Sequence, residues 1–233
     1  MTKAEVAIPE AAGLPAVQDM SDMYEPTTDV QSPSIYLMQG LSSAVKEQLA
    51  KAGDVCLMLG SDDTSPVHLI GGDSGADYFD AAILRRQVSY AIIDGADFTW
   101  LADLAAFNTE RDAGSRDAWK VHRYIIAIPS VDAMLPARLM LTKTGGQSVA
   151  KALNSLIDRA AVDHKLAQVR FSVGVKTNRA GQQYHAFKVG ATKLPDEDLA
   201  IAQAMQVEVQ RTANQWRTEN DAPTGPAVDQ PSF

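Results

Sequence analysis

The sequence predicts a β-rich α+β fold, in which a barrel or a strongly curved antiparallel sheet carries added helices and flexible terminal extensions. Three observations support this prediction. Short β-prone runs separated by turn residues recur between residues 33 and 193. Two longer segments, 148–161 and 196–216, repeat apolar residues with the period of a helix. Both ends of the chain combine prolines with acidic residues and lack a sustained period, which is typical of loosely packed extensions.

The composition is that of a globular protein, with 45% hydrophobic and 21% charged residues in 233. Length alone fits one large domain or two small ones. No apolar run approaches the roughly 18 residues that a membrane-spanning helix needs, and the first residues lack the apolar stretch of a secretion signal. Cys56 is the single cysteine and lies in an apolar run, so we expect it in the core without a disulfide. A cytoplasmic protein without a membrane partner is expected.

Four parts follow from these patterns. Residues 1–32 are predicted to form an N-terminal arm, 33–193 the β-rich core, 194–218 a C-terminal helix, and 219–233 a flexible tail. Strands are predicted at 34–38, 54–59, 66–72, 81–93, 119–128 and 137–142. Helices are predicted at 42–50, at 98–107 with Asp97 as the cap, at 148–161 with Ser148 as the cap, and at 196–216. Polar residues at 108–117 and the glycine-containing run 143–148 are predicted as loops.

Residues 168–190 are predicted to form a β-hairpin. Apolar side chains from Val169 to Val175 alternate with polar or basic ones, and Asn-Arg-Ala-Gly at 178–181 supplies the turn. If Phe187 packs in the core, the opposite face of the hairpin is basic and carries an aromatic ring. That face consists of Arg170, Lys176, Tyr184 and Lys188.

Charge is segregated along the chain, although the formal net charge is -8. Residues 118–193 contain twelve Lys or Arg against three Asp and no Glu, whereas the rest of the chain is acidic. Such asymmetry is typical of a segment that binds a polyanion. A solvated basic face that balances the acidic segments within the fold is the other interpretation.

Known catalytic and metal motifs do not explain the sequence. Gly-Asp-Ser-Gly at 72–75 resembles the sequence around a protease serine, but His68 is the only histidine before it and a triad needs its own geometry. Lys-Thr-Gly-Gly-Gln-Ser at 143–148 lacks the pattern of a phosphate-binding P-loop. The four histidines have no metal-ligand spacing, and no pair of carboxylates stands out as catalytic. We therefore predict no enzyme activity, no metal and no cofactor.

Single-stranded nucleic acid binding requires a basic groove for the phosphates and aromatic rings on which bases stack. Both ingredients occur in residues 118–193, where Trp119 and Tyr124 are interleaved with basic residues and Tyr184 lies on the basic hairpin face. The predicted nucleic-acid-binding residues are Trp119, Lys120, Arg123, Tyr124, Lys143, Arg170, Lys176, Arg179, Tyr184 and Lys188.

A β-rich core with one helix among its strands, a basic hairpin and a polar tail that ends in Phe233 resembles the bacteriophage and bacterial single-stranded DNA-binding proteins. The resemblance implies an OB-fold core, sequence-tolerant binding of single-stranded DNA in DNA replication or recombination, and homo-oligomers in a bacterium or phage-infected host. It also implies that the tail competes with DNA or docks on replication or recombination proteins through Phe233. The tail departs from the bacterial pattern, because Ser232 separates Pro231 from Phe233 and only Asp221 and Asp229 are acidic within the last thirteen residues.

Two other functions remain open from the sequence. A structural protein of a phage particle or similar assembly would also carry acidic extensions around a β-rich core. An enzyme with an unrecognised site would need a pocket with converging polar groups, which the sequence does not reveal.

Overall fold

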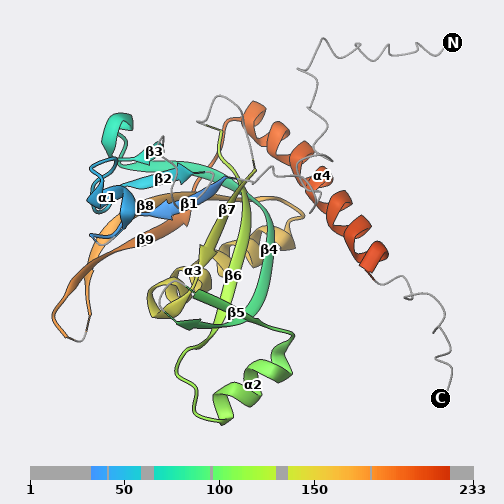
Figure 1. The fold of residues 1–233 in the computed structure, drawn as a ribbon. Coiled ribbons are helices and arrows are strands. Elements are labelled where there is room, and N and C mark those ends of the chain that lie inside the picture. The colour runs from blue at the N-terminus through green and yellow to red at the C-terminus, as the bar shows by residue number, and fades with distance from the viewer. Residues whose placement is uncertain are drawn as a thin grey trace, which may run out of the picture. The chain divides into compact units, whose positions relative to one another are not determined.

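A strongly curled nine-stranded sheet forms most of the structure that the computed structural model describes (Figure 1). The described residues are 33–40, 42–58, 66–94, 97–129, 136–178 and 180–220. They belong to one unit, which spans Gln31–Phe233. The predicted N-terminal arm, Arg179 and the tail beyond Asn220, with Phe233, lie outside the described residues.

The sheet order is β3-β2-β1-β7-β6-β4-β8-β9, and β5 pairs with the second half of β4. The strands are β1 (Ser34–Leu37), β2 (Val55–Met58), β3 (Val67–Ile70), β4 (Tyr78–Asp94), β5 (Asp97–Leu101), β6 (Ala118–Ala127), β7 (Pro136–Leu141), β8 (Ala167–Thr177) and β9 (Gln183–Ala191). The helices are α1 (Ser43–Lys46), a 3-10 turn at Gly72–Ser74, α2 (Leu104–Asp112), α3 (Lys143–Val162) and α4 (Asp196–Asn220).

The main core lies between the sheet and α3. Val149 and Leu153 of α3 are buried with the apolar residues of one sheet face. The rings of Phe79 and Phe171 stack with their centroids 4.9 Å apart, and Phe187 meets Phe171 edge-on at 5.8 Å. We call this side of the sheet the core face and the opposite side the outer face. The alternation in residues 168–190 therefore predicted the hairpin correctly, because β8 and β9 pair throughout and Phe187 joins the core.

A bulge in β4 decides which side chains reach the outer face. Phe79, Ala81 and Ile83 point into the core, so odd-numbered residues face α3 in the first half of the strand. The register then shifts between Ile83 and Arg85, where Leu84 is the extra residue. Because side chains alternate with a period of two, this one-residue shift reverses the alternation. Arg85 therefore faces outward.

Helix α4 packs against β4. Its sheet-facing residues Ala202, Met205 and Val209 are at most 4% exposed, and they keep the helical period that predicted this helix. The side-chain amide of Gln206 donates to the carbonyl oxygen of Leu84 at the bulge, at 3.5 Å. In the part of the chain that the structure describes, no helix is long and apolar enough to span a membrane.

Two sequence predictions around β5 were wrong. Residues 97–101 form a strand, because they pair with Tyr90–Asp94 as the second arm of a hairpin. The helix begins later, at Leu104, where the carboxylate of Asp103 accepts from the backbone N–H of Ala106 at 2.8 Å. Asp103 is therefore the cap, in place of Asp97. The helix continues to Asp112 through much of the predicted loop at 108–117.

Two helix starts also differ from the prediction. Helix α3 begins at Lys143 and not at Ser148, so the predicted loop at 143–148 is helical. The Ser148 hydroxyl donates to the carbonyl oxygen of Gly145 at 2.8 Å, a bond made inside the helix. The predicted helix at 42–50 is shorter, Ser43–Lys46, and Gln48 follows it with a left-handed φ of 64°.

Candidate nucleic-acid interface

Three arginines from three neighbouring strands come together on the outer face. Arg85 of β4 lies opposite Ile125 of β6, and Ile125 lies opposite Arg138 of β7. Arg123 takes the next outward position on β6, two residues from Ile125. Neighbouring strands are about 4.8 Å apart, so the three guanidinium groups share a small area. We call Arg85, Arg123 and Arg138 the arginine cluster.

Arg123 is held at the centre of this cluster by several contacts. Its Nη2 donates to the Ser89 hydroxyl at 2.8 Å, and its guanidinium carbon lies 5.2 Å from the ring centroid of Trp100. Its Nε is buried and has no hydrogen-bond partner among the described residues. Burial, and then the positive charges of Arg138 and Arg85, lower the pKa of Arg123, although a guanidinium remains charged at neutral pH. An anion at this point would supply the missing acceptor.

Trp100 is held beside the cluster by a small apolar group on the outer face. Its ring is 50% exposed and stacks on Phe98, with centroids 5.6 Å apart. Phe98 and Trp119 pack on a second apolar cluster, formed by Ala91, Ile93 and Val121 of β4 and β6. The Trp100 ring therefore has Phe98 stacked against it and the Arg123 guanidinium over it, and half of the residue's surface remains exposed for contact with a planar group.

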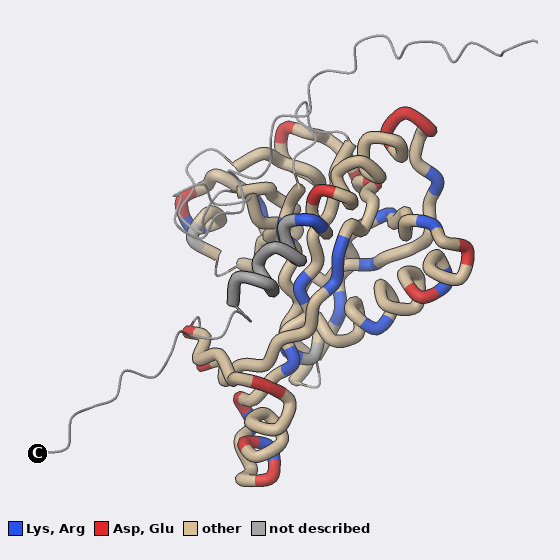
Figure 2. Tube along the Cα trace, turned by 90° about the vertical axis from the view of Figure 1, so that its right-hand side faces the viewer, with Lys and Arg blue, Asp and Glu red and all other residues tan. Residues whose placement is uncertain are grey.

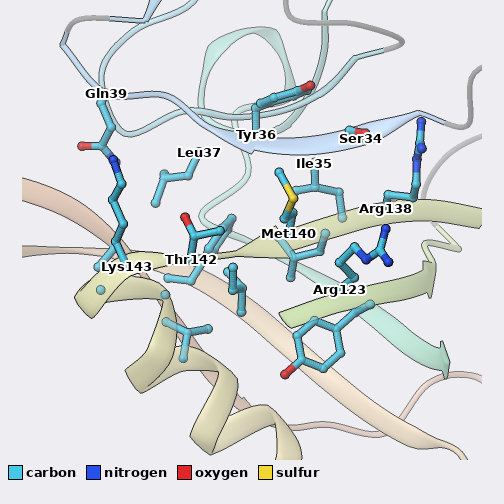
Figure 3. A pocket seen from close by; sticks show the side chains of 18 of the residues that line it. Ser34, Ile35, Tyr36, Leu37, Gln39, Arg123, Arg138, Met140, Thr142 and Lys143 are labelled. Carbon is cyan, nitrogen blue, oxygen red and sulfur yellow. The ribbon is translucent and has the colours of Figure 1, made fainter. Parts of the chain in front are cut away.

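The arginine cluster lines one part of a pocket of about 860 Å³. In Figure 3, Arg123 and Arg138 lie at one end of this pocket, and Gln39 and Lys143 lie at the other. Trp100 and Tyr184 also line it. Among the described residues, those that line the pocket include four Lys or Arg and no Asp or Glu. The described lining of the pocket is therefore positively charged, although the chain as a whole has a formal charge of -8.

Basic and acidic positions are distributed differently over the fold (Figure 2). Figure 2 shows Lys and Arg positions along strands in the middle of the fold, with most Asp and Glu positions in loops and helices around them. Helix α3 begins at the pocket, because Thr142, Lys143 and Gly145 all line it. The Thr142 side chain makes no capping bond, so the first amides of α3 add partial positive charge there.

Four of the residues predicted from the sequence line this pocket: Arg123, Tyr124, Lys143 and Tyr184. Tyr124 is only 1% exposed, so its ring has almost no surface on which a base could stack. Its hydroxyl donates to Asn154 Oδ1 at 3.0 Å in α3, and burial raises its pKa to about 12. The physical reason is alternation: neighbours on a strand point to opposite faces, so Arg123 and Tyr124 do not share one.

Arg170 is occupied by contacts within the protein. It makes two hydrogen bonds of 2.7 Å to the Asp80 carboxylate, and its guanidinium carbon lies 3.7 Å from the ring centroid of Tyr78. The hydrogen bonds to Asp80 raise its pKa. The predicted basic face of the hairpin is therefore partly neutralised at Arg170. Lys176 lies opposite Tyr184, and Lys188 extends across Gly174.

Trp119 and Lys120 point to opposite faces of β6. Trp119 is half-buried in the outer apolar cluster. Lys120 lines a second, shallower pocket between β6 and α3, together with His122, Lys151, Asp158 and other residues of α3. The side chain of Gln147 joins these elements, since its amide nitrogen donates to the Lys120 carbonyl at 2.6 Å and its oxygen lies 3.0 Å from His122 Nε2. Burial lowers the pKa of His122.

Arg85, Arg138 and Trp100 belong to the site but were not predicted. Arg85 and Trp100 lie outside the basic segment 118–193 that the charge pattern singled out. Arg138 lies within that segment, in an alternating strand whose outward positions are Arg138 and Met140. That alternation is the one sequence signal that would have indicated it.

The described residues contain no group of three or more His, Cys, Asp or Glu side chains that could hold a metal ion. Ser74, in the Gly-Asp-Ser-Gly run, donates its hydroxyl proton to the Gly71 carbonyl at 2.7 Å and so completes a local turn. Comparison of the chain with protein-family models, curated proteins and solved structures found no match.

Proposed function

We propose that the chain binds single-stranded DNA with little sequence preference, through the pocket that the arginine cluster, Lys143, Trp100 and Tyr184 line. One observation carries this proposal: cations from four elements and two aromatic rings share a groove whose described lining contains no acid, in an acidic chain. Phosphates neutralise the cations, and bases stack on the rings.

The tolerance of sequence follows from the types of contact. Arginine and lysine contact phosphates, which are the same at every nucleotide. Stacking uses the face of a base, and every base has one. Trp100, with half of its surface exposed, is the most accessible ring of the site. The interaction energy therefore comes mainly from features that do not depend on the base.

The order of five strands also supports this function. β7, β6, β4, β8 and β9 are consecutive neighbours in the sheet, and α3 joins β7 to β8. A helix between the third and fourth strands of a five-stranded Greek-key barrel is the arrangement of an OB-fold, if β4 is taken as its first strand. OB-folds bind oligonucleotides on their second and third strands and on the loops after the first and fourth. These correspond here to β6, β7, the β4–β6 connection that contains β5 and α2, and the β8–β9 turn.

The tail has a place in the same proposal. Residues 221–233, which lie outside the described residues, carry Asp221 and Asp229 and end in Phe233. We propose that they compete with DNA for the groove or dock on replication or recombination proteins, and that the protein acts as a homo-oligomer.

Adjacent arginines on β4 give a matched test of the proposal. Arg85 lines the groove, whereas Arg86 points to α3 and forms an ion pair with Asp158 at 2.8 Å. Arg85→Met and Arg86→Met change the net charge equally. We expect Arg85→Met to weaken binding of a fluorescein-labelled thymidine oligonucleotide about 10-fold, since a charge-assisted hydrogen bond is worth roughly 1.5–3 kcal/mol. Arg86→Met should stay within about twofold of the unaltered protein.

Fluorescence anisotropy at several salt concentrations measures both the affinity of each variant and the dependence of that affinity on salt. Affinity falls as salt rises, and each lost phosphate contact should make the slope of log affinity against log salt concentration less steep by about 0.7. Absence of binding by the unaltered protein at low salt would refute the proposal, and so would equal losses in the two variants.

A further inference from the structure

The pocket continues into a gap between two strands of the sheet. β1 and β7 run parallel but are paired at a single position, Ser34 with Arg138. There the backbone N–H of Arg138 donates to the Pro33 carbonyl at 2.8 Å. Beyond this point the described residues of the two strands have no further pairing across the gap. We call the space between them the wedge.

Gln39 closes the far end of the wedge by joining β1 to β9. Its side-chain amide nitrogen donates to the His185 carbonyl at 2.9 Å, and its amide oxygen accepts from the His185 N–H at 3.2 Å. A side-chain amide here makes the two bonds that a neighbouring strand would make. β1 is therefore paired with β7 at one end of the wedge and fastened to β9 at the other.

The walls of the wedge are apolar, although its ends are polar. Ile35, Leu37 and Met140 lie between β1 and β7 in Figure 3. Deeper in the pocket, Val149 and Phe187 belong to the main core and are 5% and 7% exposed. A bare phosphate would lose its hydration in such a space without an ion partner at hand. The cationic ends are the places for phosphates, and the wedge suits an uncharged group.

Backbone groups at the edges of the wedge can orient such a group. Met38 exchanges bonds with Gly53 and Asp54 on the β2 side, so its neighbour Leu37 directs its N–H and C=O to the β7 side. Arg138 directs its N–H to β1, and Met140, two residues further, does the same. One donor and one acceptor from each strand therefore border an apolar slot.

We propose that the wedge takes one nucleobase of the bound strand, whose flanking phosphates lie on the arginine cluster at one end and on Lys143 at the other. This inference rests on the proposed function. A nucleobase is flat and uncharged, carries donors and acceptors on its edge, and is tethered to anions on both sides. Unstacked bases of single strands insert into protein pockets of this kind. The pocket volume of about 860 Å³ is within the range of ligand sites.

Gly145 offers a way to fill part of the pocket without disturbing the fold. A Cβ atom at this position would meet only the Tyr184 ring, at 3.6 Å, and both residues line the pocket. At Gly146, in contrast, a Cβ would lie 3.0 Å from the Leu141 backbone. Gly145→Leu therefore adds side-chain volume inside the pocket that the wedge belongs to, and leucine favours the helix more than glycine does. Gly190→Leu is the control, because a Cβ at Gly190 meets nothing within 4 Å and Gly190 does not line the pocket.

The experiment uses the full chain and short thymidine oligonucleotides that carry 2-aminopurine, a fluorescent base, at each position in turn. Anisotropy of an end label reports total binding, and acrylamide quenching reports whether the base is buried. With the unaltered protein and with Gly190→Leu, we expect at least one position to be protected from acrylamide several-fold. With Gly145→Leu, that protection should be lost and affinity should fall about 5- to 100-fold.

The outcomes separate the two proposals. Anisotropy binding without protection of any base in the unaltered protein would overturn the base pocket and leave DNA binding intact. Protection that persists in Gly145→Leu would also overturn it and leave the wedge to another occupant, such as an extended peptide. No anisotropy change with any oligonucleotide would overturn the proposed function itself.

Discussion

Replacing Arg123 by methionine should reduce DNA affinity while leaving stability almost unchanged. Methionine keeps the apolar stem of the side chain but removes the guanidinium. The protein loses the bond to Ser89 and the contact with Trp100, which together are worth about 1.5–3 kcal/mol. The protein gains stability because the unpartnered Nε disappears from a buried position, and such a donor costs about 1–3 kcal/mol of stability. Relief of the repulsion from Arg85 and Arg138 adds to that gain.

These contributions nearly cancel, so we expect the free energy of unfolding to change by less than about 1 kcal/mol. Loss of one charge-assisted contact to a phosphate should weaken DNA binding about 10- to 100-fold. Urea denaturation followed by tryptophan fluorescence gives the first quantity, and anisotropy titration gives the second.

Arg170→Met is the matched control, with the opposite expected pattern. It removes two bonds to Asp80 and the contact with Tyr78, so stability should fall while DNA affinity changes little. If Arg123→Met lost more than about 2 kcal/mol of stability and kept its affinity, Arg123 would be a structural residue. The assignment of the groove would then be refuted.

Three further predictions concern the core, the cysteine and the tail. Tyr124→Phe should lower the free energy of unfolding by about 1 kcal/mol, because it removes the buried bond to Asn154; DNA affinity should not change, and a loss of affinity would return Tyr124 to the binding site. Burial, with a smaller effect of the Asp54 charge, raises the pKa of Cys56 from 9.0 to about 11. Native protein should therefore resist thiol reagents at pH 8, and its stability should fall as the pH rises from 9 toward 11, because the unfolded chain releases the thiol proton first; rapid labelling of folded protein would contradict this. Removal of residues 221–233 should tighten DNA binding at low salt, and unchanged or weaker binding in a titration would argue against competition by the tail.

Local patterns predicted the elements whose structure depends on their own sequence. The hairpin of β8 and β9 follows from strict alternation and a glycine turn, and α4 follows from an apolar period with three acids in its first turn. Segment 97–107 was mispredicted because it contains two aspartates that could each cap a helix. Pairing with β4 uses residues 97–101, and pairing partners far along the chain are not visible in a local window.

The site was harder to predict than the fold because its residues converge only through the sheet order. Arg123 was found because it lies in a basic strand. Arg85 is far from it in the sequence and reaches the same face only because of the bulge at Leu84. The burial of Tyr124 could have been predicted from the sequence, since a strand residue beside an outward Arg123 must point to the other face.

The bulge makes the cationic face depend on chain length as well as on composition. Arg85 and Arg86 are chemically identical, and the register alone sends one to the groove and the other to Asp158 of α3. If β4 paired regularly through Leu84, with Leu84 opposite Ile125, the two arginines would exchange their surroundings without any change in the charge of the protein. A one-residue slip of this register is therefore enough to dismantle the groove, whereas many substitutions at its rim would only weaken it.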